Sequence, residues 1–190
     1  MAQRRRGTDL EDAIHAAVLR ILGERGVGAV TMEAVAAAAG TSKPVLYRRW
    51  PDSTALLRAT LLRTATAAIP ATDTGSYRED MLAVLRGWVN LFTGPQALTL
   101  RAIIAAMTTD DELVEAFRTE VIGWRKDEMA RLLQRGIARG EVRADIPLDI
   151  VRELGQSVLW HRLLVTGDPI DDDLAVRLVD EVLLPVVTPR

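Results

Sequence analysis

The 190-residue sequence contains no cysteine and only two histidines, which limits the chemistry available to it. Without cysteine the chain forms neither disulfides nor thiolate metal sites, as is typical of proteins in the reducing cytoplasm. The two histidines, His15 and His161, lie far apart in the sequence, so a transition-metal site is not expected. We therefore predict a cytoplasmic protein with no metal or other cofactor.

Long apolar runs and catalytic motifs are also missing. No apolar run reaches the roughly 18 residues needed to span a bilayer, and the opening MAQRRRG has no apolar segment of the kind found in signal peptides. The sequence has no glycine-rich phosphate loop, no HExxH, no GxSxG, and no nucleophile with a histidine base. These absences disfavour a membrane protein and an enzyme, and a small all-α enzyme is kept only as an alternative.

Helical periodicity extends along nearly the whole chain, and no segment has the alternation of a β-strand. Helices are predicted at about 9–25, 34–39, 52–68, 76–92, 110–139, 147–166 and 171–184, with a short one after Gly40 and another ending at Met107. The predicted helix caps are Thr31, Thr41 or Ser42, Asp52 or Ser53, Ser76 in a capping box with Glu79, and the acidic start Asp171, Asp172 and Asp173. Residues 70–75 are predicted to be a linker. The fold class is therefore predicted to be all-α.

The two short helices on either side of Gly40 have the pattern of a helix-turn-helix. The first carries Val35, Ala36 and Ala39, which are small enough for a second helix to pack closely, and Pro44 is tolerated in the first turn of the second. A helix-turn-helix places its second helix in the major groove of DNA. The basic and aromatic side chains of that helix are suited to phosphates and base edges.

This segment resembles the N-terminal signature of the tetracycline-repressor (TetR) family of bacterial transcription regulators. The matching residues are Thr31, Val35, Ala36, Ala39, Gly40, Thr41, Ser42, Leu46, Tyr47, Trp50 and Leu57. The resemblance implies a helix-turn-helix domain over 1–51, with a disordered basic arm over 1–8, and a ligand-binding and dimerisation domain over 52–190. One departure is Ser53, because the family usually has a phosphate-contacting lysine at the start of the fourth helix; Arg48, Arg49 or Arg58 could compensate.

Charge is unevenly divided along the chain. Residues 1–63 carry 10 Lys/Arg and 6 Asp/Glu, a net charge of +4, whereas residues 64–190 carry 14 and 20, a net charge of −6. This division favours orientation of the N-terminal end toward nucleic acid. The residues predicted to bind DNA are Arg4, Arg5, Arg6, Thr31, Thr41, Ser42, Lys43, Pro44, Val45, Tyr47, Arg48 and Arg49. For the three arginines of the arm, a solvated tail is an equally good interpretation.

The helix predicted at 147–166 is apolar on two sides, so it must be covered twice, and the final predicted helix adds further apolar residues. In the resembled family these helices pair with their copies in a four-helix bundle, which implies a homodimer here. The predicted interface residues are Val151, Leu154, Gly155, Val158, Leu174, Leu178 and Val182. The alternative is a single internal bundle without a dimer.

Aromatic residues are few, eight in all, yet several share helix faces with methionines or leucines. Such faces are either ordinary core or the wall of a ligand pocket, and the resemblance implies that an effector binds in this body. The predicted ligand-binding residues are Met81, Trp88, Phe92, Met107, Phe117, Val121, Trp124, Glu128, Trp160 and His161. The effector is expected to be apolar or aromatic. Glu128 would either pair with Arg131 or Arg135 or meet a polar or cationic ligand group.

Two further expectations concern the histidines. His15 lies off the apolar stripe of the first helix and is expected at the surface, and His161 is expected in the core or the interface. Taken together, the sequence predicts a homodimeric repressor that binds a palindromic operator and is released by a small-molecule effector. The alternative with the same fold is a ligand-binding helical module whose DNA reader is degenerate.

Overall fold

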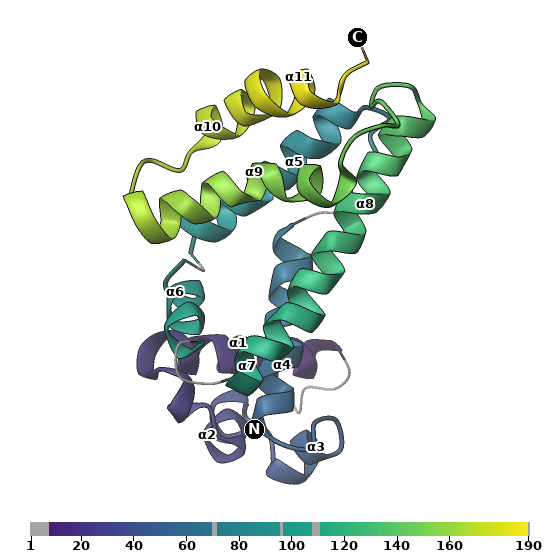
Figure 1. Ribbon diagram of the computed structural model, residues 1–190. Helices are drawn as coiled ribbons and strands as arrows, with labels where there is room; N and C mark the ends of the chain where they lie inside the picture. The colour runs from purple at the N-terminus through teal and green to yellow at the C-terminus, as the bar shows by residue number, and fades with distance from the viewer. Residues whose placement is uncertain (1–7, 70–71, 96, 108–110, 190) are drawn as a thin grey trace. The chain divides into compact units, whose positions relative to one another are not determined.

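The computed structural model describes residues 8–69, 72–95, 97–107 and 111–189, and within these ranges it contains helices, turns and loops but no strand (Figure 1). The α-helices are α1 (Thr8–Arg25), α2 (Met32–Ala39), α3 (Lys43–Tyr47), α4 (Ser53–Ala68), α5 (Tyr77–Thr93), α6 (Ala97–Ala106), α7 (Asp111–Ala116), α8 (Gly123–Ala138), α9 (Leu148–His161), α10 (Asp172–Arg177) and α11 (Leu184–Val187). The all-α prediction is confirmed. None of the described helices is long and apolar enough to cross a membrane.

The chain packs as two compact units. The N-terminal unit comprises the residues up to Thr64 together with Leu98–Glu120, and the C-terminal unit comprises Ala65–Ala97 with the residues from Val121 onward. Helix α4 therefore begins in the first unit, and its last residues belong to the second. The predicted boundary between a DNA-binding and a ligand-binding domain, at residues 51 and 52, stays a prediction. The two compact units describe how the chain packs and not which part performs which function.

Three π-helical turns interrupt the long helical runs expected near the C-terminus. They are Phe117–Ile122, Arg162–Thr166 and Leu178–Leu183, while a 3-10 turn, Val27–Ala29, follows α1. The predicted outer limits of these runs are close to the observed ones, but each π turn holds an extra residue relative to an α turn. The side chains that follow are rotated around the axis, so a helical wheel drawn from the sequence misplaces them.

The predicted N-terminal caps form with the expected geometry. The amides of Ala34, Ala55 and Leu174 donate to the side chains of Thr31, Asp52 and Asp171 at 3.1, 2.7 and 2.9 Å. The capping box at α5 is only half formed, because Glu79 N donates to Ser76 Oγ at 3.5 Å whereas Ser76 N donates to Thr74 Oγ1. Ser42 caps α3 by position but without a side-chain hydrogen bond.

The core of the N-terminal unit is built on α1, where Ile14, Val18 and Leu22 are fully buried and repeat at helical spacing. The expectation for His15 is wrong. Its side chain is buried, its Nδ1 lies 2.7 Å from Thr60 Oγ1 of α4, and its ring meets Trp50 edge-on at 5.5 Å. The burial of His15 could not be predicted from the apolar stripe of α1, because it depends on a hydrogen bond to a residue of α4.

In the C-terminal unit, α5 packs against α8 and α9, and the last helical run, Asp172–Val187, packs on α5 and α9 (Figure 1). A Cβ atom at Gly155 would lie 3.0 Å from Leu85 Cδ2 and 3.2 Å from Leu183 Cδ1, so a small residue is needed where α9 approaches its neighbours. Arg78 donates two hydrogen bonds to the carboxylate of Asp180, at 2.7 and 2.8 Å. These contacts fix α5 to the last helical run.

Candidate nucleic-acid interface and ligand cavity

Helices α2 and α3 form a helix-turn-helix within the N-terminal unit. Gly40 ends α2 with φ +65°, a left-handed conformation that favours glycine, and Thr41 N donates to Ala36 O at 2.9 Å to close the turn. Val35 and Leu46 are fully buried, so one side of each helix is fixed in the core. The opposite side of α3 is consequently presented to solvent.

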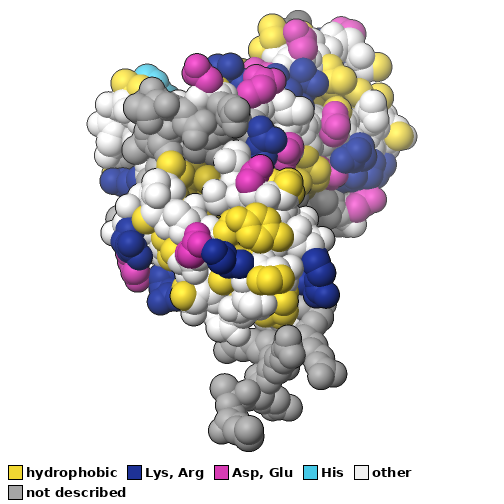
Figure 2. All heavy atoms as spheres, turned by 90° about the horizontal axis from the view of Figure 1, so that it is seen from below, with side chains coloured by type: hydrophobic (Ala, Val, Ile, Leu, Met, Phe, Trp, Pro, Cys, Tyr) yellow, Lys and Arg dark blue, Asp and Glu magenta, His cyan; other side chains and the backbone are white. Residues whose placement is uncertain are grey.

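The predicted DNA-binding side chains gather on this outer side. Thr31, Ser42, Lys43, Pro44, Tyr47, Arg48 and Arg49 are exposed, and Thr41 and Val45 are half-buried. Figure 2 views the N-terminal unit from the side on which α3 lies and shows basic side chains around an apolar patch, with a few acidic ones between them. Arg4, Arg5 and Arg6 lie outside the described residues.

Lys43 is not free in this structure, because its ammonium forms an ion pair with Glu33 of α2. The hydrogen bond and the opposite charge lower the pKa of Glu33 and raise the pKa of Lys43. Both side chains are exposed, so the pair is screened by solvent and salt. Lys43 can therefore exchange the carboxylate for a group on DNA. This partner was not predicted, because Glu33 lies ten positions before Lys43 and on a different helix.

At the start of α4, where the lysine is replaced by Ser53, the residue is half-buried and Asp52 caps the helix. Among the arginines named as substitutes, Arg48 and Arg49 are exposed whereas Arg58 is half-buried with its Nε atom inaccessible. The two exposed arginines are thus better placed to contact phosphates.

Three aromatic side chains meet in the C-terminal unit. Trp88 and Phe92 of α5 lie 5.2 Å apart between ring centroids, and Trp160 of α9 contacts them edge-on at 5.7 and 4.9 Å. All three were predicted to bind ligand, and the structure brings them together as a packed cluster. Such pairs stabilise the contact between α5 and α9.

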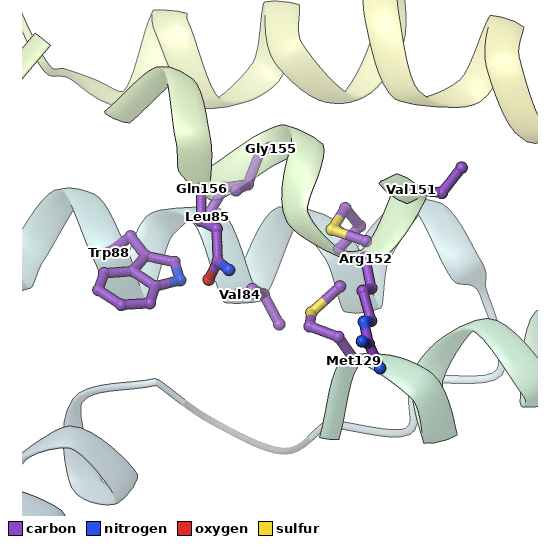
Figure 3. Close-up of a pocket in the computed structure, with 9 residues that line it drawn as sticks. Val84, Leu85, Trp88, Met129, Val151, Arg152, Gly155 and Gln156 are labelled. Atoms are coloured by element: carbon purple, nitrogen blue, oxygen red, sulfur yellow. The ribbon is translucent and has the colours of Figure 1, made fainter. Parts of the chain in front are cut away.

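Next to this cluster, a narrow cavity lies between α5, α8 and α9 (Figure 3). It is lined by Met81, Val84, Leu85, Trp88, Met129, Val151, Arg152, Gly155 and Gln156. About 10 Å³ is open to the centre of a water molecule, which is room for about one water. Figure 3 shows Arg152 reaching from α9 toward α8 and the amide of Gln156 extending from α9 toward α5.

The ten predicted ligand-binding residues do not all line this cavity. Met81 and Trp88 do, and Phe92 and Trp160 adjoin it through the aromatic cluster. Met107 and Phe117 belong to the N-terminal unit. Val121 is buried and Trp124 half-buried in the C-terminal unit, whereas His161 is exposed. His161 is therefore not in the core of the subunit, and its place in an interface stays a prediction.

Glu128 already has a partner. Its carboxylate forms an ion pair with Arg131, three residues further along α8. Of the two interpretations offered for Glu128, the structure agrees with the ion pair. Because its charge is already paired, Glu128 does not need a cationic ligand group.

Two arginines near the cavity were missed by the sequence analysis. Arg125 is 2% exposed, and burial lowers the pKa of its guanidinium to about 10, with Glu128 opposing the shift. Arg152 lines the cavity. Both were overlooked because arginine on a helix is ordinarily a solvated surface residue. The only available indication was their position on faces that also carry apolar residues.

The predicted interface residues divide between two sides of the last helices. Val151, Gly155, Leu174 and Leu178 are buried within the subunit, whereas Leu154 and Val158 are half-buried and Val182 is exposed. Large apolar side chains exposed in the same helical runs are Ile150, Leu164, Val165, Val182 and Val186. Helix α9 thus buries one side within the subunit, whereas Ile150 is exposed and Leu154 and Val158 are only partly covered by the described residues. The predicted interface stays a prediction.

Comparison with known proteins agrees with this architecture. The family model "Bacterial regulatory proteins, tetR family" matches residues 14–60, and "Tetracyclin repressor-like, C-terminal domain" matches residues 71–182. The HTH-type transcriptional regulator YdeS of Bacillus subtilis is 30% identical over 181 residues, which cover 93% of this chain and 91% of that protein. The DNA-binding transcriptional repressor TetR of Mycobacteroides abscessus is 32% identical over 186 residues, 97% of each chain.

Among solved structures, the TetR family transcription regulator SCO0332 shares 30% sequence identity and superposes with a TM-score of 0.74, covering 95% of this chain and 100% of that one. The relatives are transcription regulators, and the match extends through both units. Together with the helix-turn-helix and the helical C-terminal unit, these matches show that the chain belongs to the TetR family of DNA-binding transcription regulators.

Proposed function

We propose that this regulator is a repressor that binds a palindromic operator as a homodimer in the cytoplasm and leaves it when a small molecule binds the C-terminal unit. The observation that carries the proposal is the exposed side of α3. There, Tyr47 is 53% exposed, Lys43 in the same helix and Arg48 and Arg49 directly after it are also exposed, and Leu46 is fully buried. A large aromatic side chain left in solvent among cations is suited to a phosphate-lined groove.

The dimer is inferred from the uncovered side of the last helices. Ile150 is 56% exposed and Val165 71%, although α9 already buries its other side in the subunit. Apolar residues that recur along a helix in solvent mark an interaction surface. A two-fold pairing through this side would present two α3 helices for half-sites about one DNA turn apart.

The effector is proposed to act by favouring a conformation with weaker operator affinity. A ligand shifts such an equilibrium only by its difference in affinity for the two states. The aromatic cluster and the cavity beside it are the part of the C-terminal unit where a small molecule would contact α5, α8 and α9 together.

The test is selection of bound fragments from pooled genomic DNA, followed by footprinting. We expect a palindromic footprint protected by two subunits, and loss of protection when Ile150→Asp separates the dimer, as measured by sedimentation. A dimer that survives Ile150→Asp together with Val165→Asp would place the interface elsewhere.

A second candidate function is a ligand-binding module with a degenerate reader. It is favoured by Ser53 in place of the phosphate-contacting lysine and by the engagement of Lys43 with Glu33. Failure to recover any specific fragment, with ligand binding retained, would decide for it.

A further inference from the structure

Two side chains that line the cavity between α5, α8 and α9 have buried hydrogen-bond donors without acceptors. Trp88 Nε1 and Arg152 Nε belong to lining residues, and within the described residues neither atom has a hydrogen-bond partner, although both are inaccessible to solvent. Burying a donor without a partner is unfavourable. The cavity wall is therefore short of acceptors.

A second guanidinium lies one side chain behind this wall. Arg125 is 2% exposed, its Nη2 lies 3.0 Å from Met129 Sδ, and its Nε and Nη1 have no hydrogen-bond partner among the described residues. Met129 lines the cavity, and its thioether is a weak acceptor. Within the residues that the structure describes, neither Arg125 nor Arg152 forms an ion pair.

Among the described residues that line the cavity there is no Asp or Glu, so no carboxylate of this part of the chain offsets these charges from inside it. Gln156 provides one amide that can donate or accept. The carboxylate next along α8, Glu128, is held by Arg131. A buried arginine without an ion-pair partner is costly, and an anion brought by a ligand would reduce that cost.

We propose that the effector is an organic anion whose carboxylate enters this cavity, accepts hydrogen bonds from Trp88 Nε1 and the Arg152 guanidinium, and draws in Arg125 as a second cation. The proposal rests on the proposed function, in which an effector binds this unit, and it assigns the chemical class of that effector. The apolar body of the ligand packs on Val84, Leu85 and the aromatic cluster. The protein's polar contact to the ligand is therefore cationic, whereas a contact through Glu128 would have been anionic.

Entry requires side chains to move, since the open space accommodates only about one water. Met81 and Met129 are the side chains able to do so, because methionine is unbranched and adapts to irregular shapes. Displacement of Met129 also removes the side chain that separates Arg125 from the cavity. The liganded state thus differs from the unliganded one in the packing of α5 against α8.

The proposal is tested with two sets of probes that share a body and differ in charge. One set is 1-naphthaleneacetate, 1-naphthaleneacetamide and 2-(1-naphthyl)ethylamine, and the other is octanoate, octanamide and octylamine. Calorimetric titration of the full-length protein should give an affinity for at least one acid about tenfold above that for its amide, with the amine weakest.

Arg152→Gln and Arg125→Met should each reduce the affinity for the acid to that for the amide while leaving amide binding unchanged. Arg152 is half-buried, so its variant keeps the test valid if the Arg125 variant unfolds. Lys126→Gln is the matched control, because it removes a positive charge from the same helix as Arg125 at a surface ion pair with Glu153. It should retain the preference for acid.

Three results would overturn the proposal: an amide or amine that binds as tightly as its acid in both sets of probes, a preference for acid unchanged in both arginine variants, or neither acid binding at millimolar concentration. Operator release is measured separately. Acid binding that depends on the arginines but releases no DNA upholds the anion site and refutes the effector function. Release by a neutral compound with no acid binding upholds the function and refutes the anion site.

Discussion

The surface of α3 and the cavity of the C-terminal unit use the same type of side chain in opposite ways. Directly after α3, Arg48 and Arg49 are exposed, where water and salt screen each charge. Beside the cavity, Arg125 and Arg152 have inaccessible nitrogen atoms without partners. Exposed arginines suit a long polyanion such as DNA, because many weak contacts add up. A buried arginine instead discriminates between ligands that carry an anionic group and ligands that do not. Burial, and not residue type, therefore separates the two proposed functions.

The largest expected effect is obtained by removing a core residue from one unit at a time. Leu46→Ala should cost about 3 kcal/mol of stability, since it leaves a void behind α3, and should abolish operator binding while probe binding in the C-terminal unit persists. Leu159→Ala, at an equally buried position of α9, is the matched control and should impair the probes first. Thermal unfolding with both binding assays is the measurement. Equal loss of both activities in both variants would show that the two units do not behave independently.

Packing between α5 and α9 can be tested without a change of charge. Gly155→Val should cost about 2 kcal/mol, because the added atoms collide with Leu85 and Leu183. Gly28→Ala is the control, since a Cβ there meets nothing within 4 Å. The free energies of unfolding of the two variants are compared in urea, and a Gly155 variant as stable as wild type would mean that α9 can shift away.

On α3, two substitutions separate sequence reading from general DNA affinity. Lys43→Ala should weaken binding about tenfold and relax the preference at one base pair, whereas Tyr47→Phe should weaken all operator variants alike. Affinities are measured on a panel of operators with single base-pair changes. If the two substitutions have the same profile across the panel, the assignment of Lys43 to a base edge is wrong.

The smallest effect concerns His15. Burial, and then the positive charge of Arg63, lower the pKa of its imidazole from the ordinary 6.5. The unfolded chain then binds the proton more readily, so the stability contributed by neutral His15 is complete above pH 6.5 and is lost as the pH falls toward the lowered value. In the His15→Gln variant, the free energy of unfolding should therefore depend less on pH below 6.5, as measured by urea unfolding at a series of pH values. A curve with the same slope in the variant would assign the pH dependence to other groups.

The sequence predicted the N-terminal unit more completely than the C-terminal one. The turn at Gly40, the cap at Thr31 and the exposed side of α3 depend on neighbouring residues, and local patterns predicted all three. The environments of His15 and Arg125 depend on which distant helix covers them, which periodicity cannot show. The π turn at Leu178–Leu183 also made periodicity misleading, because it rotates the following side chains away from their positions on a regular helical wheel.

Glu33 gives the α3 surface a built-in counterion. When Lys43 turns to DNA it releases a cation from the duplex, but the carboxylate it leaves behind then attracts a cation of its own. Each phosphate contact ordinarily adds roughly 0.9 to the slope of log affinity against log salt concentration. This residue pair should add almost nothing, because ion release at one end balances ion uptake at the other. The regulator would then hold its operator more evenly across changes in cellular ionic strength than its number of basic side chains suggests.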